Sequence, residues 1–239
     1  MPRLDDPEGV RREYADESRF AVRAAAWNTA TGPDAKAVAF DAVAEVAPRR
    51  VLEVGPGRGE LAERILRELG ADVIAVDQSE RMVELTRSRG VEAVVGDVQA
   101  LPFEDASFDC VVAAWMLYHV PDLELGLSEL VRVLRPGGRL VAVTNSDDNL
   151  RELWAPFGER ARRQHPFSAE NGEEHLRRHF ARVEAREVRG TVTFADWDAA
   201  HGYLAASVSR ADLADELPRF EGALVASRLV VVFVAETAP

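Results

Sequence analysis

A run of three alternating glycines is the first part of the sequence that suggests a ligand site. Residues 51–54 read VLEV, an apolar stretch typical of a strand, and Gly55, Gly57 and Gly59 follow at every second position. A helical stretch, ELAER at 60–64, begins directly after them. Glycine lets the backbone turn sharply and come close to a ligand. A strand that delivers such a loop to the start of a helix is typical of a site for a nucleotide-like cofactor.

The spacing of these glycines disfavours a dinucleotide. The dinucleotide fingerprint is G-x-G-x-x-G, and its third glycine would fall at Glu60 when counted from Gly55. A carboxylate at Glu60 would stand near the helix start, where a pyrophosphate would otherwise bind. We therefore expect a ligand with a cationic amino-acid end rather than one that presents phosphate to this loop.

The pattern E-x-G-x-G-x-G that begins at Glu53 resembles motif I of the class I S-adenosylmethionine (SAM)-dependent methyltransferases. Three more segments are similar to the type 11 methyltransferase family: G-D-x-x-x-L-P-F at 96–103, S-F-D at 107–109 and L-R-P-G-G-R-L at 134–140. The resemblance implies methyl transfer with SAM as cofactor and S-adenosylhomocysteine as product. It also assigns to SAM the contacts in this first loop, namely Glu53, Gly55, Gly57 and Gly59.

The acid at the end of the second apolar stretch is the expected ribose ligand. Asp77 lies 22 residues after Gly55, and a carboxylate there can accept hydrogen bonds from two vicinal ribose hydroxyls. Dinucleotide enzymes use the same device, so Asp77 indicates adenosine rather than SAM in particular. The alternative is that Asp77 caps the following helix, for which Ser79 is the better residue. Gln78 belongs to the same predicted set of cofactor contacts.

The segment after the third predicted strand is expected to meet the adenine ring. By the resemblance, Asp97 accepts a hydrogen bond from the adenine amino group, and the backbone amide of Val98 contacts the ring. The alternative for Asp97 is an ordinary turn after a strand. Ala114, where the fourth predicted strand ends, completes the predicted cofactor contacts.

Regular alternation of strand and helix from 50 to 144 must position these residues. It predicts an α/β fold with a Rossmann-like, mainly parallel sheet and helices on both faces. The apolar stretch at 109–114 reads as a buried central strand, and proline and glycine at 135–138 end the helix before them. After residue 150 the rhythm changes, and we expect helical cap segments and a final, antiparallel strand over 224–235.

We expect a single methyltransferase domain over residues 1–239. Its parts would be N-terminal helices or lid (1–47), a SAM-binding core (48–146), a cap or substrate segment (147–223) and the final strand (224–239). Within the cap segment the sequence predicts helical stretches at 150–164, 170–180, 196–207 and 211–220, and a strand at 181–192.

The chemistry asks little of the protein, because the SAM sulfonium is already an activated methyl donor. The site must align a nucleophile and exclude water, and an oxygen or nitrogen nucleophile can also need a proton removed. Ligands of open α/β sheets sit outside the carboxyl ends of the strands, which places residues 115–119 and 145–148 near the methyl group. His119 is the predicted base, with a hydrogen bond to the helix cap near Asp122 as its alternative. Asp147 is the second predicted catalytic residue, or else the cap of the following helix.

Aromatic residues from several segments form the predicted acceptor pocket: Tyr14, Trp115, Tyr118 and Trp154. We expect residues 150–180 and the N-terminal helix around Tyr14 to act as a lid over the sheet edge, with Phe157 and Phe167 as further apolar walls. Ordinary packing is the alternative for each aromatic residue. The segments Y-A-D at 14–16 and F-S-A-E-N-G at 167–172 also resemble the family.

The remaining histidines offer weaker signals. His165 and His201 lie in the variable half and could line the pocket, with a surface role as the alternative. His175 and His179 stand four residues apart, a spacing found among metal ligands, but no third ligand is evident in the sequence, so we expect no metal.

Composition excludes several classes of partner. The net charge of −12 disfavours a nucleic-acid substrate, which requires a basic surface. No apolar run approaches the length of a membrane span, and the start MPRLDDPEG is unlike a secretory signal. A single cysteine, Cys110, rules out an internal disulfide. These features predict a cytoplasmic protein without a membrane partner, and they leave its oligomeric state open.

The predicted function is methyl transfer from SAM to an oxygen, nitrogen or carbon nucleophile of a small molecule. The N/D-P-P-Y/F sequence typical of methyltransferases that act on base amines or glutamine is absent, since residues 114–118 read AWMLY. Two alternatives stay open. One is a SAM-binding regulatory or scaffold protein without transfer activity, and the other is an NAD-dependent oxidoreductase, which the glycine spacing disfavours.

Overall fold

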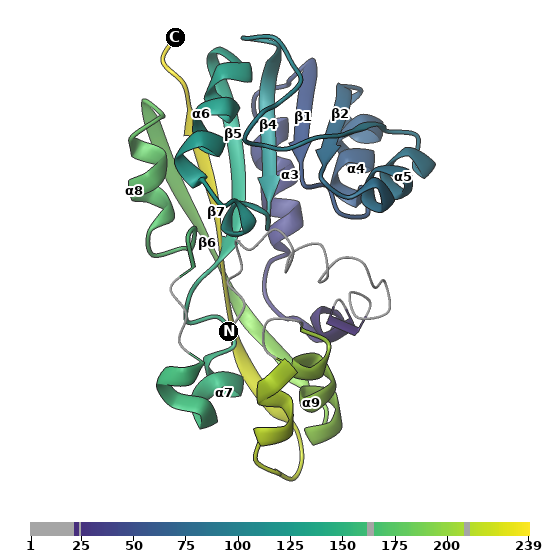
Figure 1. The fold of residues 1–239 in the computed structure, drawn as a ribbon, viewed down its shortest axis with the longest axis vertical. Coiled ribbons are helices and arrows are strands. Elements are labelled where there is room, and N and C mark those ends of the chain that lie inside the picture. Colours follow the sequence, from purple (N-terminus) through teal and green to yellow (C-terminus); the bar gives the residue numbers. More distant parts are fainter. Residues whose placement is uncertain (1–21, 24, 162–164, 208–210) are drawn as a thin grey trace.

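The protein is built on one seven-stranded sheet (Figure 1) with the strand order β3-β2-β1-β4-β5-β7-β6. The computed structural model describes residues 22–23, 25–161, 165–207 and 211–239. The first five strands pair in parallel, and β7 pairs antiparallel with both β5 and β6. The strands are β1 (Arg50–Val54), β2 (Asp72–Asp77), β3 (Glu92–Val95), β4 (Phe108–Ala114), β5 (Leu134–Asn145), β6 (Arg182–Phe194) and β7 (Leu224–Glu236). The predicted fold class and the antiparallel final strand are confirmed.

Helices cover both faces of the sheet because alternate strand residues face opposite sides. Leu52 belongs to a core cluster with α6 and α8, whereas its neighbour Val51 belongs to a cluster with α3, α4 and α5. Both side chains are fully buried. The helices on the sheet are α3 (Ala35–Ala44), α4 (Glu60–Leu69), α5 (Glu80–Ser88), α6 (Leu123–Val133) and α8 (Gly172–Arg177).

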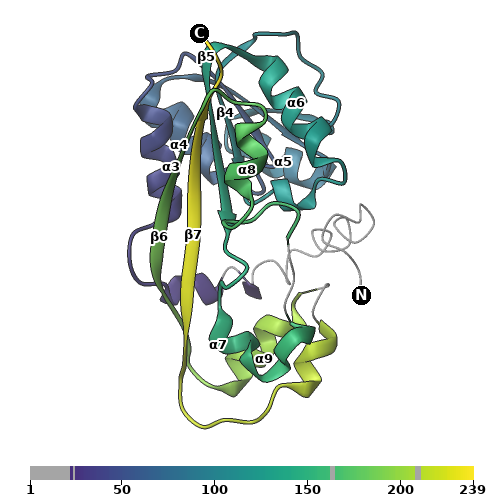
Figure 2. The ribbon, with the colours of Figure 1, turned by 90° about the vertical axis from the view of Figure 1, so that its left-hand side faces the viewer.

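A smaller cap with its own core lies beyond the carboxyl end of the sheet. Figure 2 shows β6 and β7 running past the other strands toward α7 (Arg151–Trp154) and α9 (Trp197–Ala205). Three 3-10 helices complete the cap: η1 (Trp27–Thr29), η3 (Ala155–Arg160) and η4 (Ala211–Glu216). Its hydrophobic cluster, which includes Leu153 and Leu204, is separate from the two clusters of the sheet. The paired ends of β6 and β7, called the β6–β7 ribbon, reach into this cap. Because Phe194 pairs with Leu224, the segment between them leaves the ribbon and returns to it at neighbouring positions.

The segment 147–223, expected as a cap or substrate segment, also supplies part of the sheet, because it contains the strand predicted at 181–192, which is the edge strand β6. It also contains α8, whose Leu176 is fully buried in the core on the α6 face. Phe167, expected in a pocket wall, has no exposed surface and packs edge-on against Phe233 of β7, with ring centroids 5.7 Å apart. Within 147–223, α8 and Phe167 thus belong to the core of the sheet, and other residues of the segment form the separate cap cluster.

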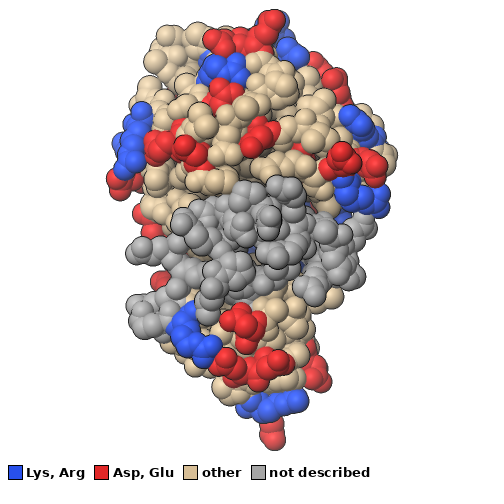
Figure 3. Space-filling view, viewed as in Figure 1, with Lys and Arg blue, Asp and Glu red and all other residues tan. Residues whose placement is uncertain are grey.

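Charges of both signs are interspersed on the face shown in Figure 3. Several form pairs that tie distant elements together: Arg139 of β5 meets Glu45 at 2.8 Å and Glu236 at 2.6 Å. Among the residues that the structure describes, no helix combines the length and apolar character needed to cross a membrane.

Candidate functional site

The three glycines after β1 all adopt positive φ angles, of 67°, 56° and 75°, but they serve different purposes. A Cβ atom on Gly55 would lie 2.8 Å from Cβ of Met116, and one on Gly59 would lie 2.9 Å from Oγ1 of Thr86. These two glycines are needed for packing within the protein. A Cβ on Gly57 would meet no described atom within 4 Å. Gly57 therefore presents its backbone to open space, where a ligand can approach it.

Glu53 supplies an uncompensated carboxylate beside this loop. Its side chain is 2% exposed, and its Oε2 atom has no hydrogen-bond partner among the described residues. Burial raises the pKa of Glu53 to about 8. With this pKa the carboxyl group is protonated near neutral pH, and a ligand that carries an ammonium group would favour its ionised form and supply a donor to the buried oxygen. The residues present therefore fit the amino-acid end of SAM.

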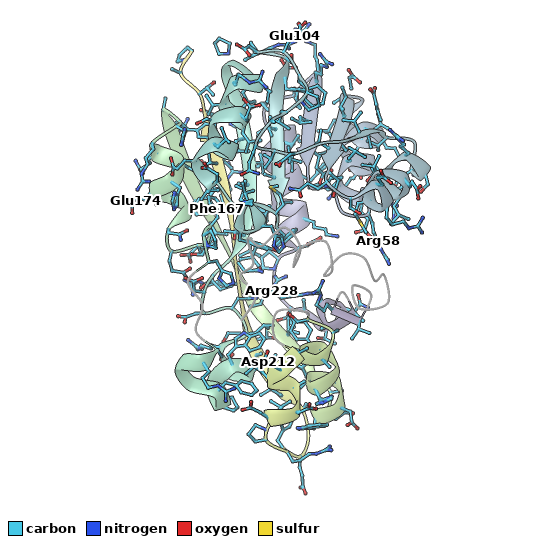
Figure 4. All side chains as sticks on the ribbon, viewed as in Figure 1. Arg58, Glu104, Phe167, Glu174, Asp212 and Arg228 are labelled. Atoms are coloured by element: carbon cyan, nitrogen blue, oxygen red, sulfur yellow. The ribbon has the colours of Figure 1, made fainter. Side chains whose placement is uncertain are left out.

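Glu60 begins α4, as the sequence predicted, and its carboxylate meets Nζ of Lys36 at 2.6 Å. Arg58, in the same loop, lies at the edge of the sheet that faces the cap (Figure 4).

Asp77 ends β2 next to the glycine loop. Its Oδ1 atom accepts a hydrogen bond from the backbone amide of Ser79 at 2.9 Å. Burial raises the pKa of Asp77, and the backbone amides of Ser79, Gly57 and Gln78 oppose that rise. The cap of α5 is Ser79, whose side chain accepts from the amide of Met82. Asp77 is thus not the helix cap, and its carboxylate stands beside Gly57 as a ribose ligand must. Gln78 is exposed.

Asp97 occupies the loop after β3 and is held by a residue that sequence reasoning missed. Both carboxylate oxygens accept from the side-chain amide of Gln99, at 3.1 and 3.0 Å, and Oδ1 also accepts from its backbone amide at 2.9 Å. The carbonyl oxygen of the Gln99 side chain accepts from the amide of Asp122 at 3.0 Å. Val98 is 2% exposed and packs in the core. An adenine amino group at Asp97 would share or replace the contact with Gln99.

The loop after β4 carries the predicted aromatic residues. Trp115, just beyond Ala114, has φ 56°, a conformation that costs a bulky side chain energy and is held in place by its surroundings. Its amide donates to the Val143 carbonyl at 2.8 Å, and its indole Nε1 donates to Oδ1 of Asn145 at 3.2 Å. The loop after β4 is thereby fastened to β5.

Tyr118 and His119 lie in the single turn η2 (Leu117–His119), and their ring centroids are 4.5 Å apart. The cap of α6 is Asp122, which accepts from the amide of Leu125. The side chains of Tyr118 and His119 are partly buried. Because Met116 touches Gly55, this turn stands next to the glycine loop.

Asp147, after β5, is paired with a histidine rather than with a helix. Its Oδ1 atom lies 2.6 Å from Nδ1 of His165 and accepts from the His165 backbone amide at 3.3 Å. The following helix, α7, begins after Leu150 and has no side-chain cap. The alternative reading of Asp147 as a helix cap is therefore wrong. The His165 ring also lies 6.1 Å from that of Tyr118, so the loops after β4 and β5 meet here.

The F-S-A-E-N-G segment fixes this pair in place. Glu170 accepts from the Ser146 hydroxyl at 2.5 Å and from the Asp147 amide at 2.9 Å. Asn171 accepts from the Ser168 amide at 2.7 Å and donates to the His165 carbonyl at 2.8 Å. Sequence reasoning flagged the segment by resemblance but missed these roles, since they depend on contacts across about twenty residues of irregular chain.

Other residues predicted for the pocket pack within the cap or lie outside the described residues. Trp154 packs against the cap cluster and donates from Nε1 to the Asn149 carbonyl at 2.9 Å. Phe157, 8% exposed, is part of the same cluster. His201 stacks on Trp197 with ring centroids 4.5 Å apart. Tyr14 and the Y-A-D segment lie outside the described residues.

His175 and His179 do stand close together, but they share an acid rather than an ion. Nδ1 of His175 lies 2.9 Å from Glu124, and Nε2 of His179 lies 2.8 Å from the other oxygen of the same carboxylate. Within the described part of the chain, no group of three or more potential ligands is arranged to hold a metal.

Comparisons with known proteins bear on the core. The family model of a methyltransferase domain matches residues 52–142. Two demethylmenaquinone methyltransferases are similar in sequence. That of Clavibacter sepedonicus is 45% identical over 105 residues, or 42% of this chain and 42% of the relative. That of Thermus thermophilus is 40% identical over 112 residues, or 44% and 51%. The chain thus spans about half the length of the curated relatives it matches.

The fold extends the likeness beyond the matched segment. Phosphoethanolamine N-methyltransferase 2 of Haemonchus contortus, solved with phosphomonomethylethanolamine and S-adenosylhomocysteine, aligns with a TM-score of 0.64 at 18% identity. The alignment covers 100% of this chain and 61% of that one. At this identity the likeness concerns the fold. Residues 52–142 thus match a methyltransferase domain, and the fold and the glycine loop of this chain are similar to those of class I SAM-dependent methyltransferases.

Proposed function

We propose that this protein transfers the methyl group of SAM to a small-molecule nucleophile at the carboxyl edge of its sheet. The observation that carries the proposal combines Glu53 and Gly57, which lie at the end of β1 and in the loop that follows it. The buried Oε2 atom of Glu53 has no hydrogen-bond partner among the described residues, and a Cβ on Gly57 would meet no described atom within 4 Å. Together they suit a ligand with a cationic amino-acid end on a nucleoside, and Asp77 and Asp97 would take its ribose and adenine.

When bound, SAM supplies an activated methyl group, because the sulfonium sulfur can keep the electron pair of the broken C–S bond and leave as a neutral thioether. The rest falls to the residues of this chain. Trp115 and Tyr118 offer ring faces against which a planar acceptor can be oriented, and the cap helps to exclude water from the reacting atoms. Asp147 and His119 border the same region.

The acceptor is the less constrained half of the proposal. The matched family segment ends at residue 142, before Asp147, His165 and the whole cap. Two similar proteins are demethylmenaquinone methyltransferases by name, which supports including quinol and quinone rings among the acceptors to be tried. Oxygen, nitrogen and carbon nucleophiles all belong in that trial.

The test has two independent readings. Calorimetry measures the binding of SAM and S-adenosylhomocysteine, and transfer of a labelled methyl group is followed over phenols, amines, quinones and carboxylic acids. The proposal expects both binding and transfer to at least one class. Binding without any transfer would favour a regulatory or scaffold protein, and binding of NADH in place of SAM would indicate an oxidoreductase.

A further inference from the structure

His165 and Asp147 form a hydrogen-bonded couple that the predicted mechanism did not contain. We propose that His165 is the residue that takes a proton from the methyl acceptor, with Asp147 as its positioning residue, and that the acceptor is an aromatic hydroxyl. This inference rests on the proposed function, and it names the acceptor class that the same site would serve.

The contact with Asp147 fixes the tautomer of His165. An ionised carboxylate can only accept hydrogen bonds, so the short 2.6 Å contact requires the proton of His165 to sit on Nδ1. The lone pair is then on Nε2, which makes that nitrogen the proton acceptor. A carboxylate in this position also stabilises the imidazolium that forms once the proton has been taken.

Hydrogen bonds hold Asp147 and His165 in place. The Asp147 carboxylate accepts from His165 twice and from the Ser168 hydroxyl at 3.4 Å. The Asp147 amide is held by Glu170, and the His165 carbonyl is held by Asn171. The turn itself is fixed against the sheet, because a Cβ on Gly172 would lie 2.6 Å from the Phe233 ring. A base held in this way loses little entropy when its substrate arrives.

His165 and Asp147 lie close to the loop after β4. The side chains of His165 and Asp147 are 17% and 24% exposed, so they are sheltered yet reachable. The Tyr118 ring is a neighbour of both histidines, with centroids 4.5 Å from His119 and 6.1 Å from His165. A chain of neighbours leads from Tyr118 through Met116 to Gly55 of the cofactor loop. The couple therefore borders the region where a methyl donor and its acceptor would meet.

Three of the other described histidines meet different acids. His175 and His179 meet Glu124 between α6 and α8, and His201 lies in the cap, 3.8 Å from the almost fully exposed Asp215. His119 was the predicted base, and the proposal assigns that role to His165, whose Nδ1 atom meets Asp147.

The acceptor class follows from this chemistry. A neutral hydroxyl is a weak nucleophile and gains from a base as it attacks, whereas a thioether or a tertiary amine has no proton to give. In the step, the acceptor O–H bond breaks and its proton goes to Nε2 of His165, while the oxygen forms the new bond to the methyl carbon. The sulfur keeps the electrons of its C–S bond, and the imidazolium later returns the proton to solvent. The flat faces of Tyr118 and Trp115 favour a hydroxyl on an aromatic ring.

The test uses the full chain and three variants: His165→Gln, Asp147→Asn and the matched control His201→Gln. With a phenol as acceptor, His165→Gln should lower kcat by about 10²- to 10⁴-fold and remove the acidic limb of the pH–rate profile. Its rate should recover at high pH, where the phenol ionises by itself. Asp147→Asn should cause a smaller loss and abolish the low-field Nδ1–H signal in the proton NMR spectrum. His201→Gln should match the wild type.

A second measurement needs no turnover. 4-Nitrophenol is coloured when ionised, so its absorbance reports proton loss on binding to the protein loaded with S-adenosylhomocysteine. The wild type and His201→Gln should ionise the bound probe, and His165→Gln should not. Calorimetry of SAM checks that each variant is folded and separates this inference from the proposed function. An unchanged pH profile in His165→Gln, or a bound probe that stays protonated in the wild type, would overturn the proposal, as would failure of the probe to bind.

Discussion

The core of the sheet and the cap beyond it are organised in different ways. In the core, buried strands alternate with helices. Successive buried residues along a strand point to opposite faces of the sheet and pack into two large clusters, one on each face. In the cap, the helices are short, three are 3-10 helices, and Gly158 breaks one of them with φ 55° and ψ −135°. The residues proposed to bind the cofactor lie in the regular core, whereas those proposed for the acceptor lie on irregular loops. The proposed cofactor site thus depends on regular elements, and the proposed acceptor site depends on contacts between loops.

Matched cavities in the core and in the cap test whether these two regions are independent of each other. Leu127 in α6 and Leu204 in α9 are both fully buried, one in the core and one in the cap. Leu127→Ala should lower the free energy of unfolding by about 2–5 kcal/mol, because the cavity lies in the main core. Leu204→Ala should reduce hydrogen-exchange protection over α9 while leaving SAM affinity intact. If Leu204→Ala weakens SAM binding as much as Leu127→Ala does, the two regions act as one cooperative unit.

A pair of glycines provides the second comparison. Gly57→Val should weaken SAM binding at least about 100-fold, because its side chain would fill the open space beside the loop. Gly202 lies in α9, where an added Cβ meets nothing within 4 Å. Gly202→Ala should leave SAM affinity unchanged and stabilise the protein by about 0.5–1 kcal/mol. Calorimetry and thermal unfolding test both, and normal SAM binding by Gly57→Val would refute the assignment of that loop.

Asp77 offers a smaller effect on the cofactor side. Asp77→Ala removes a carboxylate expected to accept from the ribose, and hydrogen bonds to a charged group are worth about 1.5–3 kcal/mol. SAM affinity should therefore fall by at least about tenfold. Asp97→Ala is the natural companion, and its effect should be smaller because Gln99 already engages that carboxylate. Calorimetry that finds full SAM affinity in Asp77→Ala would remove Asp77 from the site.

The pH dependence of stability sharpens the role of Glu53. Burial raises its pKa to about 8 in the folded protein, against about 4.3 in an unfolded chain. Between these values the folded state holds the extra proton, so the contribution of Glu53 is complete below about pH 4.3 and is lost as the pH rises toward 8. Its slope is at most about 1.4 kcal/mol per pH unit. Glu53→Gln should flatten the wild-type curve over this range in denaturant titrations, and identical slopes would contradict the burial argument.

The sequence foretold the regular half of the molecule far better than the irregular half. The order of elements from 50 to 145, the cap of α5 at Ser79 and the direction of β7 all follow from periodicity, turn residues and the family pattern. The glycine loop was expected, but the separate reasons for Gly55 and Gly59 depend on Met116 and Thr86, which are distant in sequence.

The acceptor side could not be foretold in the same way. The contact between Asp147 and His165 joins two loops that carry no periodic signal, and the Gln99 bridge depends on where α6 begins. Phe167 looked like a pocket wall because it is aromatic and lies outside the strands, yet tertiary packing places it under α8. Such pairings are decided by the fold as a whole rather than by local pattern.

The pairing of Phe194 with Leu224 has a consequence for how such proteins diversify. Everything between these two residues leaves the ribbon and returns to it at neighbouring positions, so residues 195–223 form an insertion with adjacent ends. Insertions of this kind can change length or sequence without disturbing the strands that support them. The tip of the ribbon is therefore a natural grafting point, at which one methyl-transfer scaffold can exchange part of its cap by recombination or by design.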